Sequence, residues 1–156
     1  MKSKSTWAQK LANSKGLPKR VRIKKQDQKR LGRGMMVIPA PKDVDKAMKS
    51  VRKGKLATVD MIRKSISKRY KTTVCCPLTT GIFVWIAANA AYEEMQSGKK
   101  NCTPYWRTIK TDGSLNPRYP GGELEHAKKL RQEGHKITRI GKKLAVLDFE
   151  YKLQKV

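Results

Sequence analysis

Acidic residues are scarce in this chain of 156 residues: 12 Asp and Glu stand against 37 Lys and Arg, and the formal net charge is +25 at pH 7. Such an excess of positive charge favours a polyanionic partner, with nucleic acid as the first candidate. Long apolar runs are missing as well, since none approaches the roughly 20 residues that a transmembrane helix needs. We therefore expect one soluble, nucleic-acid-binding domain that makes no use of a membrane.

Patterns for metal binding and for disulfides are also missing. The two histidines, His126 and His135, and the three cysteines, Cys75, Cys76 and Cys102, show neither the C-x-x-C nor the H-x-x-x-H spacing of a zinc site. The adjacent pair of cysteines makes a poor disulfide. The first six residues lack the apolar stretch of a secretory signal. These absences predict a cytoplasmic protein in a reducing compartment, with no metal and no cofactor.

Positive charge is concentrated at the N-terminal end. Residues 1–34 hold 12 Lys and Arg against the single Asp27, which leaves this segment a net charge of +11. Charge of one sign repels itself unless a polyanion neutralises it, so residues 1–36 are predicted to form a basic arm that binds phosphates, with a solvated extension as the alternative. Partial order is expected in the arm, including a turn or two of helix from Trp7. The prolines of residues 37–41 predict an extended connector into a folded domain of residues 37–156.

Three helices are expected in the first half of that domain. Asp43 is predicted to cap the first, whose apolar positions recur at helical spacing up to about Gly54. Thr58 is predicted to cap the second. Residues 78–95 carry hardly any polar side chains before their last positions, which predicts a central helix whose burial is the main hydrophobic contribution to the fold. Replacing its Trp85 by Ala should then cost about 3 to 5 kcal/mol of unfolding free energy.

The second half mixes short strands with one more helix. We expect a strand over residues 105–110, a turn at Asp112-Gly113, a helix over 123–133 that Gly134 ends, and two strands around residues 141–143. This order of elements is typical of a helix-turn-helix core with a wing, although many three-helix domains share it. The predicted fold class is mainly α with small β: a winged helix-turn-helix domain with a C-terminal β-hairpin and a basic N-terminal arm.

Five segments together resemble a known family. They are Gly-Lys-Leu-Ala-Thr-Val-Asp-Met-Ile at 54–62, Ile-Ala-Ala-Asn at 86–89, Thr-Pro-Tyr-Trp-Arg-Thr-Ile-Lys-Thr-Asp-Gly-Ser-Leu at 103–115, Tyr-Pro-Gly-Gly at 119–122 and Leu-Arg-Gln-Glu-Gly at 130–134. Their order and spacing resemble the DNA-binding domain of the methylated-DNA protein-cysteine methyltransferases over roughly residues 37–137. The resemblance implies a winged helix that enters the minor groove, and a damaged guanine that active members flip into a pocket holding a reactive cysteine.

The reactive residues of that family are replaced in this chain. Active members carry Pro-Cys-His-Arg, whereas the matching stretch here is Pro104-Tyr105-Trp106-Arg107. The alignment also puts Ala127 where the family has the Glu that orients its His. A phenol and an indole cannot replace a thiolate and its base at neutral pH, so we predict no alkyl transfer. In this respect the chain resembles the alkyltransferase-like branch, which lacks the cysteine and binds alkylated DNA to flag it for repair.

The candidate contact residues follow from this comparison and from the charge pattern. Those predicted to touch DNA are the small residues that begin the central helix, the hinge Asn that the resemblance implies, and the residues around the wing: Thr79, Thr80, Gly81, Asn89, Arg107, Lys110, Ser114 and Arg118. Pro104, Tyr105 and Trp106 form the predicted lesion pocket, where the two aromatic rings can stack on an unstacked base. Alternatively, these rings fill the vacated pocket as core, and the basic residues form a solvated face.

The sequence therefore predicts a monomer that binds duplex DNA, alkylated sites included, with a repair protein as a further partner. Two other functions stay open at this point. One is an active alkyl acceptor that uses a displaced cysteine, Cys102 or Cys75. The other is a basic module that binds RNA.

Overall fold

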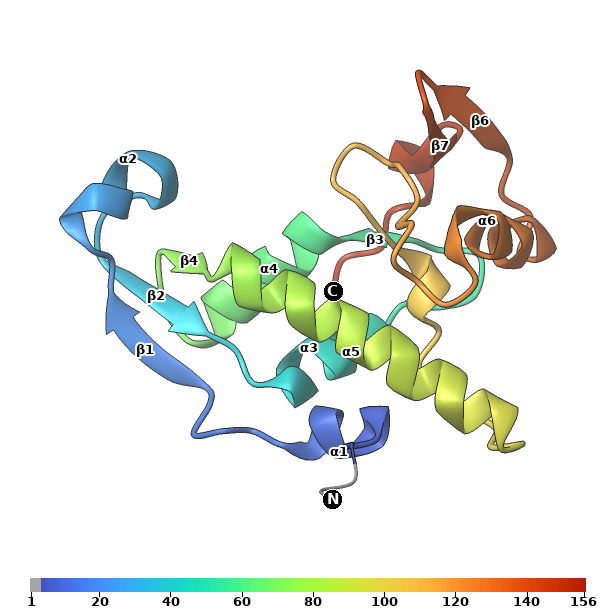
Figure 1. Cartoon of the computed structure of the whole chain (residues 1–156). Coiled ribbons are helices and arrows are strands. Elements are labelled where there is room, and N and C mark those ends of the chain that lie inside the picture. The colour runs from blue at the N-terminus through green and yellow to red at the C-terminus, as the bar shows by residue number, and fades with distance from the viewer. Residues whose placement is uncertain (1–3) are drawn as a thin grey trace.

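The computed structural model describes residues 4–156 (Figure 1). Residues 1–3, where the predicted basic arm begins, lie outside the described part. The elements in chain order are α1 (Trp7–Ala12), β1 (Lys19–Arg22), η1 (Lys25–Asp27), α2 (Gln28–Leu31), β2 (Met35–Ile38), α3 (Pro41–Lys49), β3 (Ala57–Thr58), α4 (Val59–Arg69), β4 (Val74–Cys75), α5 (Pro77–Gln96), η2 (Tyr105–Arg107), β5 (Thr108–Ile109), α6 (Gly122–Gln132), β6 (Ile137–Ile140), β7 (Lys143–Val146) and η3 (Phe149–Lys152). The chain is mainly α with small sheets, as the sequence predicted.

The long helix α5 turns small residues, rather than large ones, toward the core. Its buried apolar positions are Val84, Ala87, Ala88, Ala90 and Ala91. By contrast, Trp85 is 36% exposed and Leu78 is 72% exposed. The prediction that Trp85 is packed in the core is therefore wrong. Alanines on the inner face let neighbouring elements pack closely, whereas Leu78 and Trp85 are left on the outer face.

Helix α3 begins earlier and ends earlier than predicted. Pro41 occupies its first turn, where the missing N–H of proline costs no hydrogen bond. Asp43 lies within that turn and accepts a hydrogen bond from the backbone N–H of Ala40 at 2.9 Å. Asp43 therefore stabilises the start of α3 from inside the helix and is not its cap. The helix ends at residue 49, before the predicted stop at Gly54.

Helix α4 begins as predicted. Oγ1 of Thr58 accepts a hydrogen bond from the backbone N–H of Met61 at 3.2 Å, which caps the helix. The same helix buries Ile62 and Ile66 in the larger core cluster, to which α3 and α5 also contribute. In Figure 1, α3 and α4 lie behind α5, so the three helices form the body of the domain. No helix within residues 4–156 is long and apolar enough to cross a bilayer.

The sheets are short and join distant parts of the chain. β2 pairs with β1 in antiparallel and with β4 in parallel orientation, and β3 pairs with β5 in parallel orientation. β6 and β7 form an antiparallel hairpin, which confirms the predicted C-terminal hairpin. An isolated bridge between Ser114 and Ala145 attaches the preceding loop to this hairpin.

The N-terminal segment is folded against the domain. The short helix predicted from Trp7 is present as α1, which packs on α5, and the rings of Trp7 and Trp85 meet edge to face with centroids 4.7 Å apart. Further along, Ile23 is buried and β1 pairs with β2. The predicted boundary after residue 36 falls inside β2, so both predicted parts share one sheet. Part of the expected connector at 37–41 is accordingly a strand.

Candidate functional site

Tyr105 lies inside the protein at the start of η2. Its side chain is 1% exposed, and its ring meets the rings of Trp106 and Tyr119 edge to face, at centroid distances of 5.3 and 5.2 Å. The hydroxyl of Tyr105 is buried and has no hydrogen-bond partner among residues 4–156. Aromatic rings therefore surround the position at which the family resemblance implies a reactive cysteine.

Burial determines the chemistry of this phenol. Desolvation, and then the nearby Glu125 and Tyr92, raise the pKa of Tyr105 to about 12. The hydroxyl consequently stays protonated at neutral pH, and a protonated phenol is too weak a nucleophile to replace a thiolate. What the hydroxyl can still do is donate or accept a hydrogen bond with a group that reaches it.

The backbone around Tyr105 differs from the strand predicted over residues 105–110. Residues 105–107 form a 3₁₀ turn in which the N–H of Arg107 donates to the carbonyl of Pro104 at 3.1 Å, and only Thr108 and Ile109 pair with β3. In a strand, residues 105 and 107 would share one face. The turn instead lets Tyr105 enter the core while Arg107 reaches Glu133.

Trp106 lies between the interior and an open cavity. It is half-buried, contacts both core clusters, and has the ammonium of Lys129 4.8 Å from its ring centroid. It also lines a cavity of about 520 Å³, whose lining is Lys49, Met95, Lys99, Asn101, Cys102, Pro104, Trp106 and Arg107. Of the predicted pocket residues, Pro104 and Trp106 thus line a common hollow and Tyr105 does not.

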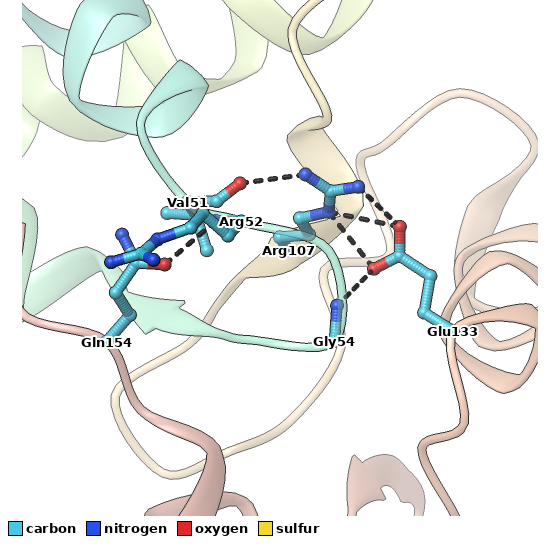
Figure 2. Close-up of polar contacts among 6 residues, drawn as sticks. All are labelled: Val51, Arg52, Gly54, Arg107, Glu133 and Gln154. Atoms are coloured by element: carbon cyan, nitrogen blue, oxygen red, sulfur yellow. Dashed lines mark hydrogen bonds and ion pairs between the residues drawn. The ribbon is translucent and has the colours of Figure 1, made fainter.

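Arg107, predicted to contact DNA, is bound instead to a carboxylate of its own chain (Figure 2). Its Nη2 lies 2.7 Å from Oε1 of Glu133, its Nε donates to the same carboxylate at 3.0 Å, and its Nη1 donates to the carbonyl of Val51 at 2.8 Å. Burial alone raises the pKa of Glu133, but the hydrogen bonds from Arg107 and the charge of its guanidinium outweigh burial and lower it. The carboxylate next to the Trp106-Arg107 segment is therefore Glu133, whereas Ala127 is a core residue of α6.

His126 holds two loops in place from inside α6. Its Nε2 lies 2.8 Å from the carbonyl of Trp106, and its Nδ1 lies 3.2 Å from the backbone N–H of Asn116. Nδ1 therefore accepts from Asn116 while Nε2 donates to Trp106, which requires a neutral ring with its proton on Nε2. Burial lowers the pKa of His126 to about 4, so the ring is neutral at pH 7. Its role is to position the aromatic segment.

The predicted turn at Asp112-Gly113 is present. The N–H of Gly113 donates to the carbonyl of Lys110 at 2.9 Å, and Oδ1 of Asp112 accepts from the hydroxyl of Ser114 at 2.6 Å. This hydrogen bond is the largest cause of the lowered pKa of Asp112. Ser114 is buried, whereas Lys110 is half-buried and Arg118 is exposed. Of these predicted contact residues, only the two cations are therefore open to a partner.

At the start of α5, too, some of the predicted contact residues are accessible and others are buried. Gly81 is exposed and Thr79 half-buried, but Thr80 is buried and donates its hydroxyl to the carbonyl of Cys76 at 2.6 Å. The side chain of Thr80 is thus committed to the protein. Further along, Nδ2 of Asn89 donates to the carbonyl of Trp85 at 2.9 Å, within the helix.

Cys75 and Cys102 are poor nucleophiles where the structure places them. Cys75 is buried against Thr80, and Cys102 is half-buried with its thiol 3.3 Å from the carbonyl of Lys99. Burial raises the pKa of Cys75, and burial together with Glu94 raises that of Cys102, so both thiols are protonated at neutral pH. Within residues 4–156, no three His, Cys, Asp or Glu side chains group closely enough to hold a metal ion.

Three residues of this site were not singled out from the sequence: Tyr119, His126 and Glu133. Tyr119 donates its hydroxyl to the carbonyl of Thr108 at 2.9 Å and so fixes one side of the aromatic cluster, which consists of Tyr105, Trp106 and Tyr119. Tyr119 and Glu133 lie in segments that carry the family resemblance and His126 lies between those segments, yet the role of each depends on a partner more than ten residues away. No local pattern marks such partners.

Comparison with known proteins bears on the fold. No protein-family model and no curated protein matches the sequence. Among solved structures, the chain is similar to S. pombe Atl1 in complex with damaged DNA containing O6-carboxymethylguanine, with 17% identity and a TM-score of 0.51. It is similar also to S. pombe ATL in complex with DNA, with 19% identity and a TM-score of 0.51. In both cases the similarity covers 74% of this chain and 94% of the other, so the two folds correspond over nearly the whole of the yeast protein.

Proposed function

We propose that this protein binds duplex DNA, favours alkylated guanine and transfers no alkyl group. The observation that carries the proposal is the fold shared with Atl1, a protein crystallised with damaged DNA, in a chain whose net charge is +25. A protein of this charge gains affinity for DNA when its cations release counterions from the phosphates. The aromatic segment Tyr105–Trp106, in place of a thiol and its base, suits recognition without chemistry.

In this proposal α4 and α5 act as a helix-turn-helix, and the turn at 110–113 with the β6–β7 hairpin acts as the wing. The outer face of α5 begins with Leu78, Thr79, Gly81 and Ile82, which are exposed or half-buried. Small and apolar side chains of this kind suit the minor groove, where proteins read groove shape and partly unstack bases. Lys110 and Arg118 would neutralise phosphates beside it, whereas Arg107, Thr80 and Ser114 serve the fold.

Recognition of the lesion would use the aromatic cluster. The buried hydroxyl of Tyr105 has no partner among the described residues, and an unpaired buried polar group costs about 1 to 3 kcal/mol. A modified guanine that reaches this hydroxyl when the cluster opens would supply the missing hydrogen bond. The half-buried ring of Trp106 would stack on the extruded base.

Absence of alkyl transfer follows from the acceptor groups. The phenol of Tyr105 and the thiols of Cys75 and Cys102 all have a raised pKa, and the nearest imidazole, that of His126, uses both its nitrogens in hydrogen bonds to the backbone. Among residues 4–156, no imidazole is hydrogen-bonded to any of the three acceptors, so none has a histidine base to activate it. An acceptor role for Cys102 or Cys75 is therefore disfavoured.

The test compares a plain duplex with one that contains a single O6-methylguanine, by fluorescence anisotropy over a series of salt concentrations. We expect the logarithm of affinity to fall linearly with the logarithm of salt, by about 0.9 per phosphate neutralised, and the alkylated duplex to bind more tightly. The mass of the intact protein should stay unchanged after incubation. Arg118→Gln should weaken binding and reduce the salt slope by about 1, whereas Lys53→Gln, an exposed lysine beyond α3, serves as the matched control.

Three outcomes would contradict the proposal. A stoichiometric gain of mass on a cysteine would make the protein an alkyl acceptor. An affinity that does not respond to salt would exclude phosphate binding of either nucleic acid. Tighter binding of duplex RNA than of duplex DNA would favour the RNA-binding module instead.

A further inference from the structure

A second cavity lies at the C-terminal end of the protein, apart from the aromatic cluster. Its volume is about 360 Å³, and its lining consists of Gly134, His135, Lys136, Leu147, Asp148, Tyr151 and Lys152. One wall is the segment between α6 and β6, and the other runs from the end of β7 into η3, in the red part of Figure 1. None of these residues belongs to the proposed DNA-contacting face, so the proposed binding of duplex DNA gives this cavity no role.

His135 is the buried polar group of this cavity. Its side chain is 5% exposed, and its Nε2 has no hydrogen-bond partner among residues 4–156. Burial lowers the pKa of His135, so the ring is neutral at pH 7 and can either donate or accept, according to its tautomer. Buried polar atoms without a partner are uncommon in folded proteins, and a bound group is one of the accepted explanations.

The rim of the cavity carries an aromatic ring and two cations. Tyr151 is 83% exposed, which is unusual for so large a ring and leaves its face free. Lys136 and Lys152 are also exposed, and neither is among the ion pairs found in the described part of the chain. Asp148 is the one carboxylate in the lining. The combination offers stacking, two ammonium groups and one hydrogen-bond acceptor.

The two walls are held together by the backbone. The N–H of Leu147 donates to the carbonyl of Lys136 at 2.8 Å, which joins one wall to the other. The carbonyl of Lys152 accepts from the N–H of Leu56 at 2.9 Å, which anchors the far end of η3 on the domain. The cavity is therefore part of the folded frame, and its volume lies near the lower end of the range of about 300 to 1,000 Å³ typical of ligand pockets.

We propose that this cavity binds a nucleotide, with the base stacked on Tyr151, the phosphate held by Lys136 and Lys152, and His135 hydrogen-bonded to the bound group. Proteins that bind unpaired nucleotides independently of nucleotide sequence combine aromatic stacking on the base with cations on the phosphate. Asp148 would repel a phosphate placed next to it. The base therefore lies on the Asp148 side of the cavity, where its exocyclic amine can donate a hydrogen bond to the carboxylate. The nucleotide can come from an unpaired stretch of a strand or from free solution, because both present the same base and phosphate.

The experiment follows the ring signals of His135 and Tyr151 by NMR while deoxyadenosine monophosphate is added to the full-length protein. We expect both sets of signals to shift in a saturable manner, and Tyr151→Ala to weaken binding about tenfold, the size typical of one lost base stack. Lys152→Gln should remove most of the preference for the monophosphate over deoxyadenosine. Lys142→Gln, which changes an exposed lysine in the hairpin turn outside the lining, should leave the affinity within about twofold, since isolated surface charges contribute little.

Further ligands separate the sources. A deoxyadenosine trinucleotide that binds more tightly than the monophosphate assigns the site to an unpaired strand, and equal affinity assigns it to free nucleotide; both support a nucleotide site. The inference is overturned if neither ring signal shifts. It is also overturned if inorganic phosphate shifts the signals as strongly as the nucleotide while Tyr151→Ala has no effect. Tighter binding of a phosphoserine peptide than of the nucleotide would overturn it as well. The affinity of Tyr151→Ala for duplex DNA should equal that of the wild type. A failure of the nucleotide-site proposal can therefore be distinguished from a failure of the proposed function.

Discussion

The guanidinium of Arg107 and the carboxylate of Glu133 form a two-point ion pair, with Nη2 2.7 Å from Oε1 and both side chains largely buried (Figure 2). The same carboxylate accepts from the backbone N–H of Gly54, and the same guanidinium donates to the carbonyl of Val51. The pair thereby joins η2, the end of α6 and the loop between α3 and β3. Gln154 ties the C-terminal segment to that loop through the N–H of Arg52 at 2.8 Å.

Removing one partner of this ion pair should destabilise the fold. Arg107→Ala and Glu133→Ala are each expected to lower the free energy of unfolding by about 3 to 5 kcal/mol, because each leaves an uncompensated buried charge. The double variant should be less destabilised than the sum of the two, and chemical denaturation measures the difference. Arg139→Ala, which removes an exposed arginine of β6, is the control and should change the stability by no more than about 0.5 kcal/mol. Additive effects would contradict a direct coupling.

Acid should destabilise the protein through His126 before it protonates most carboxylates. The pKa of this ring is about 4 in the folded state against 6.5 for an unperturbed histidine, so the unfolded chain binds the extra proton between these two values. The stabilisation is therefore complete above pH 6.5 and is lost as the pH falls to about 4, with a total of roughly 3 kcal/mol. Denaturation midpoints over this range measure the loss.

Substitution of His126 distinguishes its contribution to the pH dependence of stability from that of His135. His126→Gln should flatten most of the dependence of stability on pH between 6.5 and 4. His135 also has a lowered pKa, so it contributes in the same direction and leaves a residual slope. An unchanged slope in His126→Gln would show that the proton is taken up elsewhere.

Tyr105→Phe should separate packing from recognition. The hydroxyl makes no hydrogen bond among the described residues, so its removal should leave the free energy of unfolding unchanged or raise it by up to about 1 kcal/mol. If the hydroxyl serves a modified guanine, the same variant should lose affinity for the alkylated duplex and keep its affinity for the plain one. Anisotropy titrations with both duplexes decide this. Equal losses, or none, would reduce Tyr105 to a packing residue.

The pair Trp7–Trp85 should contribute modestly to stability. Since Trp85 is 36% exposed, Trp85→Ala is expected to cost about 1 to 2 kcal/mol, below the 3 to 5 kcal/mol of a fully buried tryptophan. A double-mutant cycle with Trp7→Ala should return a coupling of about 0.5 to 1.5 kcal/mol for the edge-to-face contact. A coupling near zero would mean that α1 does not rest on α5 through these rings.

Local sequence determined several of the helix ends and turns of this protein. Thr58 caps α4, Gly134 follows α6, Asp112-Gly113 forms its turn and the last strands form a hairpin, all as predicted. Each of these features depends on residues within a few positions of one another, where capping, periodicity and turn geometry act. The net charge follows from the sequence alone, and it indicated nucleic acid as the class of partner.

Only the tertiary structure decided which residues are free to act. Arg107, Thr80 and Ser114 were candidates for contact with DNA, yet their polar groups are bound to Glu133, to the carbonyl of Cys76 and to Asp112. Likewise, alanines rather than Trp85 took the inner face of α5, and Tyr105 turned into the core. The physical reason is that a buried charge or ring is stabilised by its three-dimensional neighbours, and neighbours such as Glu133, 26 positions beyond Arg107, meet only when the chain has folded.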